Sequence, residues 1–293
     1  MLINFIGLGF AQVIRNPLQI DDIDDESRIS IWNAFYKLYQ FDNSSNTWEL
    51  YDAIWCDFLK KTIDERPSNP IIYLQAVKND YLGATGGSVT GKFSSQYKWE
   101  WWKVYDFLEF ISENDKNFER KGRFQDHCNI IMERERLGYR FIDNLIVRIT
   151  SKEQITEIET AISHSTNEVQ NHLEQSLILL SNRENPDFRN SIKESISAVE
   201  AQCKIICEEP TPTLTKSLEI IQRRGIVKIH SDLNEAFQKI YRWTNDDQGI
   251  RHALKDDPTV DLEDAQFMLI ACSAFINYLQ VKKMKSDSKN KNC

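Results

Sequence analysis

Apolar residues recur every three or four positions along almost the whole chain, and this spacing restricts what the chain can fold into. It places apolar side chains on one face of an α-helix, whereas a half-buried strand would carry them at every second position. A clear example is the stripe formed by Val169, Leu173, Leu177 and Leu180. We therefore predict a mainly α protein whose apolar stripes form the cores of helical bundles.

In the N-terminal half the stripes are rich in aromatic residues, which we interpret as core-facing sides of helices and not as ligand cages. An acidic segment, DDIDDES, precedes the first stripe and suits a helix N-terminus because of the helix dipole. The three aromatic stripes are Ile29, Trp32, Phe35, Tyr36 and Tyr39; Trp48, Tyr51, Trp55 and Phe58; and Trp101, Tyr105, Leu108 and Ile111.

One segment departs from the helical period. In GYRFIDNLIVRIT, apolar and polar residues alternate on both sides of Asp143-Asn144, a dipeptide that tolerates the positive φ angles of a tight turn. We predict a small β-hairpin near residues 139–149. Thr150 or Ser151 should then cap a helix through a capping box.

The chain is long enough for two domains, because single hydrophobic cores usually stop growing near about 250 residues. Near residue 165 the aromatic-rich composition gives way to a leaner helical pattern. We therefore expect an N-terminal helical domain at 1–164, a helical bundle at 165–283 and a flexible basic tail at 284–293. Within the bundle, Asn185-Pro186, Gly225 and Asp261 are expected helix boundaries.

The last helix is expected to begin near Leu262 and to be apolar on two sides. A helix of this kind must be buried on more than one side, so we expect a homodimer through the C-terminal domain. Its two stripes are Leu262, Ala265, Leu269, Cys272, Ile276 and Leu279, and then Met268, Phe275 and Tyr278.

Composition excludes several classes of function. The six cysteines contain no C-x-x-C pair and the five histidines no H-E-x-x-H, so we predict buried thiols, no metal and no cofactor. The sequence from Gly86 to Lys92 begins like a phosphate-binding loop, but Phe93 stands where that motif needs a hydroxyl, so we expect a surface loop at 83–96. No apolar run is long enough to cross a bilayer, which predicts a cytoplasmic protein without a membrane partner.

The segment NDDQGIRHAL, residues 245–254, is the strongest candidate for a chemical site. It lies in a connection of about twenty residues, between Tyr241 and Asp261, and connections of that length in a compact bundle are usually functional or disordered. His252 can carry a proton near neutral pH, and Arg251 can hold a phosphate, so together they can cleave a ribose phosphodiester without a metal. The alternative is a solvated loop in which Arg251 pairs with a nearby carboxylate such as Asp246.

A second group of charged residues lies on one flank of the helix expected after Asn185-Pro186, beside its apolar stripe. Glu200 on this flank could orient His252 or Arg251, and the net charge of −8 does not exclude such a local basic RNA-binding site. The flank can equally be an ordinary ion-pair ladder. Its other members are Arg189, Lys193 and Lys204.

Several phrases, in order along the chain, resemble a family of bacterial proteins. IWNAFY, WWKVYDFLEF and ERERLGYRFIDNLIVRIT resemble the N-terminal domain of AbiJ-type abortive-infection proteins, and SISAVEAQCK, DDQGIRHAL and DLEDAQFMLIACSAFINYL resemble their C-terminal half. The resemblance implies a role in antiphage defence and a HEPN-like C-terminal bundle. Such bundles dimerise, and many are metal-independent ribonucleases.

The resemblance carries over only one site residue. Gly249 and His252 match the family's glycine and histidine, but Asn245, Asp246 and Asp247 stand where its leading arginine would lie. Either Arg251 takes the phosphate role, with Asp246 and Glu200 as further partners, or the domain binds RNA or a protein without cutting. RNA and a regulatory partner protein are the partners this predicts.

Overall fold

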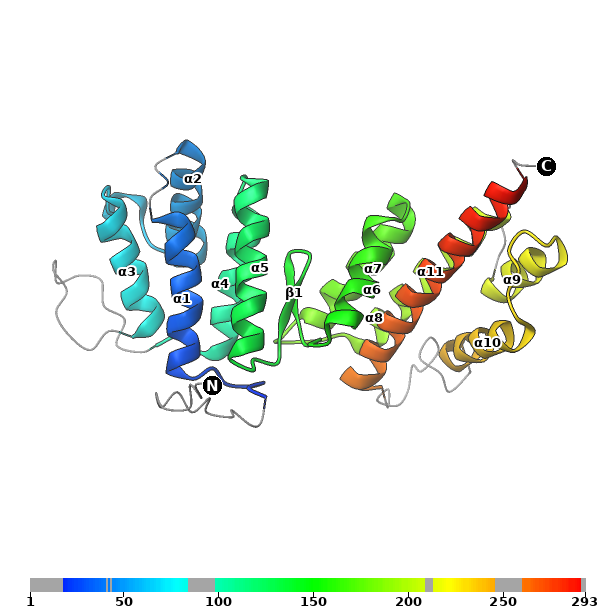
Figure 1. The fold of residues 1–293 in the computed structure, drawn as a ribbon. Coiled ribbons are helices and arrows are strands. Elements are labelled where there is room, and N and C mark those ends of the chain that lie inside the picture. Colours follow the sequence, from blue (N-terminus) through cyan, green and yellow to red (C-terminus); the bar gives the residue numbers. More distant parts are fainter. Residues whose placement is uncertain are drawn as a thin grey trace, which may run out of the picture. The chain divides into compact units, whose positions relative to one another are not determined.

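The computed structural model describes residues 18–40, 42, 44–83, 98–208, 213–245 and 260–290. The chain divides into two compact units, unit 1 at Met1–Asn144 and unit 2 at Leu145–Cys293. The described residues are mainly α-helical, with one small two-stranded sheet, so the predicted fold class is confirmed (Figure 1).

Unit 1 is a group of helices followed by one strand of the hairpin. A π-helical turn, η1, continues α2, so the second aromatic stripe belongs to two elements and not to one regular helix. The elements are α1 (Asp25–Tyr39), α2 (Ser45–Ala53), η1 (Ile54–Phe58), the 3-10 helix η2 (Ile63–Glu65), α3 (Pro70–Leu82), α4 (Trp101–Asn114), α5 (Phe118–Arg134) and β1 (Arg140–Ile142).

The core of unit 1 is aromatic, as the stripes predict. In α1, Trp32, Phe35 and Tyr39 are buried. The ring centroid of Phe35 lies 5.3 Å from that of Phe107 on α4. Ile29 was wrongly assigned to this face, because 47% of it is exposed while Ile31 is 1% exposed. The α1 helix begins after Asp24, whose carboxylate accepts a hydrogen bond from the backbone N–H of Ser27.

A buried arginine links three elements of unit 1. Arg120 on α5 is 3% exposed, and its guanidinium binds both carboxylate oxygens of Asp115, at 2.8 and 2.7 Å. The Tyr39 hydroxyl donates a further 2.8 Å hydrogen bond to Asp115, and Arg120 also contacts Asp42 and Thr47. Burial alone would raise the pKa of Asp115, but hydrogen bonds from Arg120, the Asn117 backbone and Tyr39 hold the pKa below its ordinary value.

This carboxylate should make unit 1 sensitive to acid. Since the pKa of Asp115 is lower in the folded than in the unfolded chain, its contribution to stability is complete above the unfolded value of about 3.9 and is lost as the pH falls through the folded value. We expect the free energy of unfolding to fall on acidification, and to fall less steeply in Asp115→Asn. Urea unfolding of both chains over an acidic pH series measures the two slopes.

The matched control is Asp126→Asn, because Asp126 is an exposed aspartate on α5, near Arg120 in sequence. This variant should retain the slope of the wild-type chain. Equal slopes in all three chains would show that the Asp115 carboxylate does not contribute to acid unfolding.

The predicted hairpin is confirmed. Strand β1 pairs with β2 (Leu145–Val147), and the turn between them is Asp143-Asn144, where Asp143 has a φ of 54°. The division between the two units falls in this turn. The change in composition predicts a domain boundary at 164–165, whereas the division at 144–145 puts the helix after the hairpin in unit 2.

Unit 2 is a bundle of helices in which α8 contacts α7, α9, α10 and α11. The four predicted residues of the α7 stripe are all buried. Beyond β2, the elements of unit 2 are α6 (Lys152–Ser163), α7 (Asn167–Ser181), α8 (Phe188–Cys207), α9 (Leu214–Arg223), α10 (Ser231–Asn245) and α11 (Leu262–Asn290).

Most helix ends in unit 2 follow their predicted boundary residues. Ser151 accepts a hydrogen bond from the Gln154 N–H at the start of α6, and Gly225 has a φ of 63° just after α9. The prediction for α8 was wrong by two residues: its N-cap is Asp187, which accepts from the Asn190 N–H, and not Asn185. Asp187 accepts the hydrogen bond from the first turn of the helix that Asn185 was expected to accept.

Most residues on both apolar sides of α11 are buried within unit 2. Leu269 and Ile276 are fully buried, on a helix that contacts α6, α7 and α8. On the other stripe, Met268 is also fully buried, and the ring of Phe275 stacks on that of Phe237 from α10, with centroids 3.4 Å apart. Because Phe237 of α10 packs on Phe275, a second copy of the chain is not needed to bury that ring.

The basic C-terminal segment is helical over much of its length. Helix α11 continues through Asn290, into the segment 284–293 that we expected to be a flexible tail. Lys283 is paired with Asp287 one turn later, at 2.6 Å, which is a spacing that favours helix. In the part of the chain that the structure describes, no helix meets the length and apolarity needed to span a membrane.

Candidate functional site

The described part of the predicted site lies on α8. Its four charged residues fall on one flank, where Lys193 is exposed and Arg189, Glu200 and Lys204 are half-buried. The other three predicted site residues, Asp246, Arg251 and His252, lie outside the described residues. The rejected phosphate-loop segment, from Gly86 to Phe93, also lies outside them.

Glu200 is positioned by a residue that precedes the NDDQGIRHAL segment. The hydroxyl of Tyr241 on α10 donates a 2.9 Å hydrogen bond to the Glu200 carboxylate, and Tyr241 is only 7% exposed. One turn later, the buried Thr244 donates to the backbone carbonyl of Tyr241, at 2.8 Å. Glu200 is thus hydrogen-bonded to a residue in the last turns of α10, just before the NDDQGIRHAL segment in the sequence.

A ring stack and a side-chain hydrogen bond join α10 to its neighbouring helices. Phe237 stacks on Phe275 of α11 with an angle of 15° between the rings, and the buried Asn234 donates a 2.9 Å hydrogen bond to Gln222 of α9. Leu233 on the same helix contributes less, because 37% of it is exposed. These contacts hold Tyr241 against α8.

The solvent face of α10 carries cations and one aromatic ring. Arg242 is exposed, and Trp243 beside it is 43% exposed. Lys239 on the same face pairs with Glu235, at 2.9 Å. A guanidinium beside an exposed indole is a combination that can bind the phosphate and the base of single-stranded RNA. In the sequence, Trp243 is one of the residues that favour a functional connection between Tyr241 and Asp261 over a bland linker.

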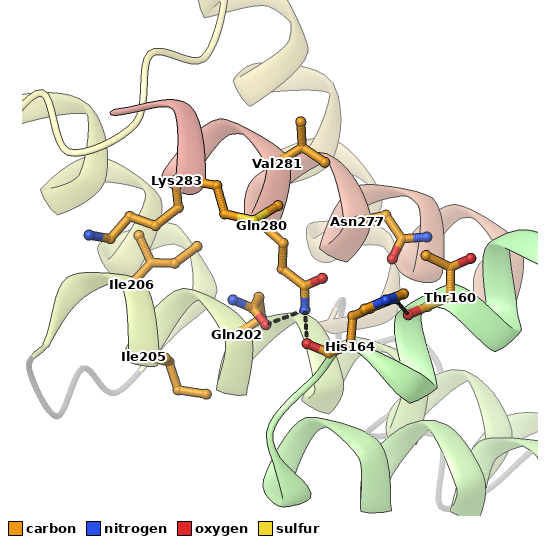
Figure 2. Close-up of a pocket in the computed structure, with 10 residues that line it drawn as sticks. Thr160, His164, Gln202, Ile205, Ile206, Asn277, Gln280, Val281 and Lys283 are labelled. Carbon is orange, nitrogen blue, oxygen red and sulfur yellow. Dashed lines mark hydrogen bonds between the residues drawn. The ribbon is translucent and has the colours of Figure 1, made fainter. Parts of the chain in front are cut away.

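A separate cavity of about 470 Å³ lies in unit 2, where α6, α8 and α11 meet (Figure 2). Exposed apolar side chains from α8 and α11 form part of its wall, namely Ile205, Val281 and Met284. Its polar groups are uncharged amides from Gln202, Asn277 and Gln280, together with Thr160, His164 and Lys283. Sequence reasoning did not find this cavity.

Amide hydrogen bonds join the helices around the cavity. The Gln280 amide N–H group of α11 donates to the Ser165 hydroxyl at 2.9 Å and to the Gln202 carbonyl oxygen of α8 at 3.3 Å. Asn277 donates to the backbone carbonyl of Glu157 on α6, at 2.9 Å. The side-chain oxygen of Asn277 is buried and has no hydrogen-bond partner in the described structure.

The described residues contain no group of three or more His, Cys, Asp or Glu side chains arranged to hold a metal ion. Of the cysteines described, Cys128, Cys203, Cys207 and Cys272 are buried free thiols, and Cys56 is partly exposed. Burial raises the pKa of Cys272 to about 12, so this thiol stays protonated and unreactive at neutral pH.

The fold and the candidate site define the class of this protein: two helical units that a short hairpin joins, with charged residues gathered on α8 and α10 of the second. The model of one protein family, described as AbiJ N-terminal domain 4, matches residues 9–164. The match covers more than half of the chain, so this protein belongs to the AbiJ N-terminal domain 4 family, which is connected with abortive infection.

The matched region ends one residue after α6, at His164, so it includes the first helix of unit 2. The helices α7 to α11 follow it. No curated protein and no solved structure gave a significant match to this chain.

Proposed function

We propose that this protein is an effector of abortive infection that cleaves RNA without a metal ion or cofactor, through a HEPN-like domain formed by the helices after residue 164. Family membership supports the defence role. The observation that carries the proposed site is the Tyr241–Glu200 hydrogen bond, because it joins a carboxylate to α10, the helix that precedes in sequence the segment containing Arg251 and His252.

The proposed reaction is attack by a ribose 2′-hydroxyl on the neighbouring phosphorus. His252 takes the proton of this hydroxyl and returns a proton to the 5′-oxygen as the P–O bond breaks, which leaves a 2′,3′-cyclic phosphate. Arg251 stabilises the negative charge that grows on the phosphorus oxygens. Glu200 and Asp246 orient these two side chains, while Arg189, Lys193 and Lys204 bind the RNA backbone.

A second candidate function is a HEPN-like module that binds RNA or a protein without cutting. Two observations favour it: the family's leading arginine is replaced by Asn245, Asp246 or Asp247, and the chain has a net charge of −8. In both functions we retain a homodimer and a regulatory partner protein as proposals. Neither function requires a membrane.

Replacing His252 with alanine tests which candidate function is correct. We expect expression of the unaltered chain to stop bacterial growth and fragment transfer or ribosomal RNA, and we expect His252→Ala to reduce cleavage at least about a hundredfold, because a general acid and base is lost. Growth curves and RNA gels from the same cultures give both readouts, and the purified chains supply melting midpoints.

The matched control is His230→Ala, since His230 is an exposed histidine of unit 2 that lies beside α10. It should leave both toxicity and cleavage unchanged. Intact RNA in every culture would exclude the nuclease. RNA binding by the purified chain without cleavage would then support the non-catalytic module.

A further inference from the structure

We propose that the cavity between α6, α8 and α11 binds a nucleotide, with the base between apolar side chains and the phosphate at Lys283. The described residues of the proposed nuclease site, which lie on α8, are not among those that line this cavity (Figure 2). Its volume of about 470 Å³ lies in the range of small-molecule sites, roughly 300 to 1,000 Å³.

The apolar wall suits the two faces of a flat ring. Ile205 and Ile206 come from α8, and Val281 and Met284 come from α11. A methionine thioether makes favourable contacts with aromatic rings. The exposed fractions of Ile205, Val281 and Met284 are 39%, 43% and 60%. Apolar side chains in the core of a helical bundle are much less exposed to water than this. A planar base would cover this surface.

The amides select a ligand with donors and acceptors on its edge. Within the described part of the chain, the buried side-chain oxygen of Asn277 accepts no hydrogen bond. Gln202 is 6% exposed, and among the described residues its amide N–H group donates no hydrogen bond, although its oxygen accepts one from Gln280. One unused acceptor and one unused donor match the edge of a nucleobase. A fatty acyl chain would leave both amide groups unsatisfied in an apolar contact.

The charge at the cavity favours an anion. Among the described residues that line it there is no carboxylate, whereas Lys283 lines it with its side chain 28% exposed. Lys283 pairs with Asp287, and a doubly charged phosphate would compete with this single exposed carboxylate for the ammonium group. A base on the amides and a phosphate on Lys283 together describe a nucleotide.

The position of the cavity suggests what the ligand would do. Thr160 and His164 belong to the end of the family-matched region, whereas all the other lining residues belong to α8 and α11 beyond it. A bound nucleotide would therefore contact α6, the last helix of the matched region, together with α8 and α11. It would stabilise unit 2 in proportion to the free nucleotide concentration.

Binding to the full chain tests this site without any measurement of RNA cleavage. The probes are AMP, GMP, CMP and UMP, the matching nucleosides, a trinucleotide, inorganic phosphate and a glycine dipeptide. Their binding is measured by the shift in the melting midpoint and by calorimetry. We expect at least one mononucleotide to raise the midpoint and to bind more tightly than its nucleoside. Binding of the trinucleotide alone would assign the same site to the end of an RNA strand.

Two variants place the ligand in the cavity. Val281→Trp fills the cavity from an exposed position, so it should weaken binding about tenfold or more. Lys283→Glu reverses the charge at the phosphate and should weaken binding by a similar factor, because one charge-assisted hydrogen bond accounts for at least about tenfold. Lys285→Glu is the control, since Lys285 is an exposed lysine on α11 that does not line the cavity. It makes the same change in net charge.

Three results would overturn the proposal. One is that no nucleotide binds, and another is that the dipeptide or phosphate alone binds as tightly as the nucleotides. The third is that Val281→Trp and Lys283→Glu bind as the control does, while all variants keep the melting midpoint of the unaltered chain. A chain that binds nucleotide but leaves RNA intact would support this site and contradict the nuclease.

Discussion

Replacing Arg120 with methionine is expected to lower the free energy of unfolding by about 3–5 kcal/mol, because the change leaves a buried carboxylate without its partner. Asp115 is 4% exposed and receives two hydrogen bonds from the Arg120 guanidinium. The remaining hydrogen bonds, from the Tyr39 hydroxyl and the Asn117 backbone N–H, cannot neutralise its charge. Chemical denaturation of the two chains at neutral pH measures the difference.

The matched control for this change is Arg123→Met. Arg123 lies on the same helix but is exposed, so its removal should change the free energy of unfolding by less than about 0.5 kcal/mol. Combining Arg120→Met with Asp115→Asn should recover part of the loss, because the unpaired charge is then absent. Equal losses for Arg120→Met and Arg123→Met would contradict a stabilising role for the buried pair.

Local features of this fold could be predicted from the sequence because their causes are local. The hairpin follows from Asp143-Asn144 between alternating residues, and the start of α6 follows from Ser151. The α8 cap was missed by two residues because Asn185 and Asp187 are both good N-caps, and only the backbone geometry distinguishes them. Ile29 was misplaced because the spacing fits two neighbouring faces of α1.

Contacts between distant residues could not be predicted in this way. Tyr39 and Asp115 are 76 residues apart, and Glu200 and Tyr241 are 41 apart, so nothing in either local pattern pairs them. The cavity in unit 2 needs three helices that are separate in sequence. Of the predicted site, the helical flank of α8 follows from its period, whereas the partner of Glu200 depends on how α10 packs.

The prediction for the last helix concerns which of its sides are buried. Leu269→Ala should lower the free energy of unfolding by about 2–5 kcal/mol, since Leu269 is fully buried on α11 and its truncation leaves a cavity. Phe267→Ala removes a larger side chain two residues away, but 57% of Phe267 is exposed, so the loss should stay below about 1 kcal/mol. Denaturant unfolding of both variants gives this comparison.

The same two variants also test the homodimer, because most residues of both apolar stripes of α11 are already buried within unit 2. If Phe267 is exposed to water in solution, the loss for Phe267→Ala should be small at every protein concentration. A large loss that grows with protein concentration would contradict this expectation, since it would mean that a second copy of the chain covers Phe267. The surface around Phe267, and not the buried stripe of Met268 and Phe275, would then be the interface.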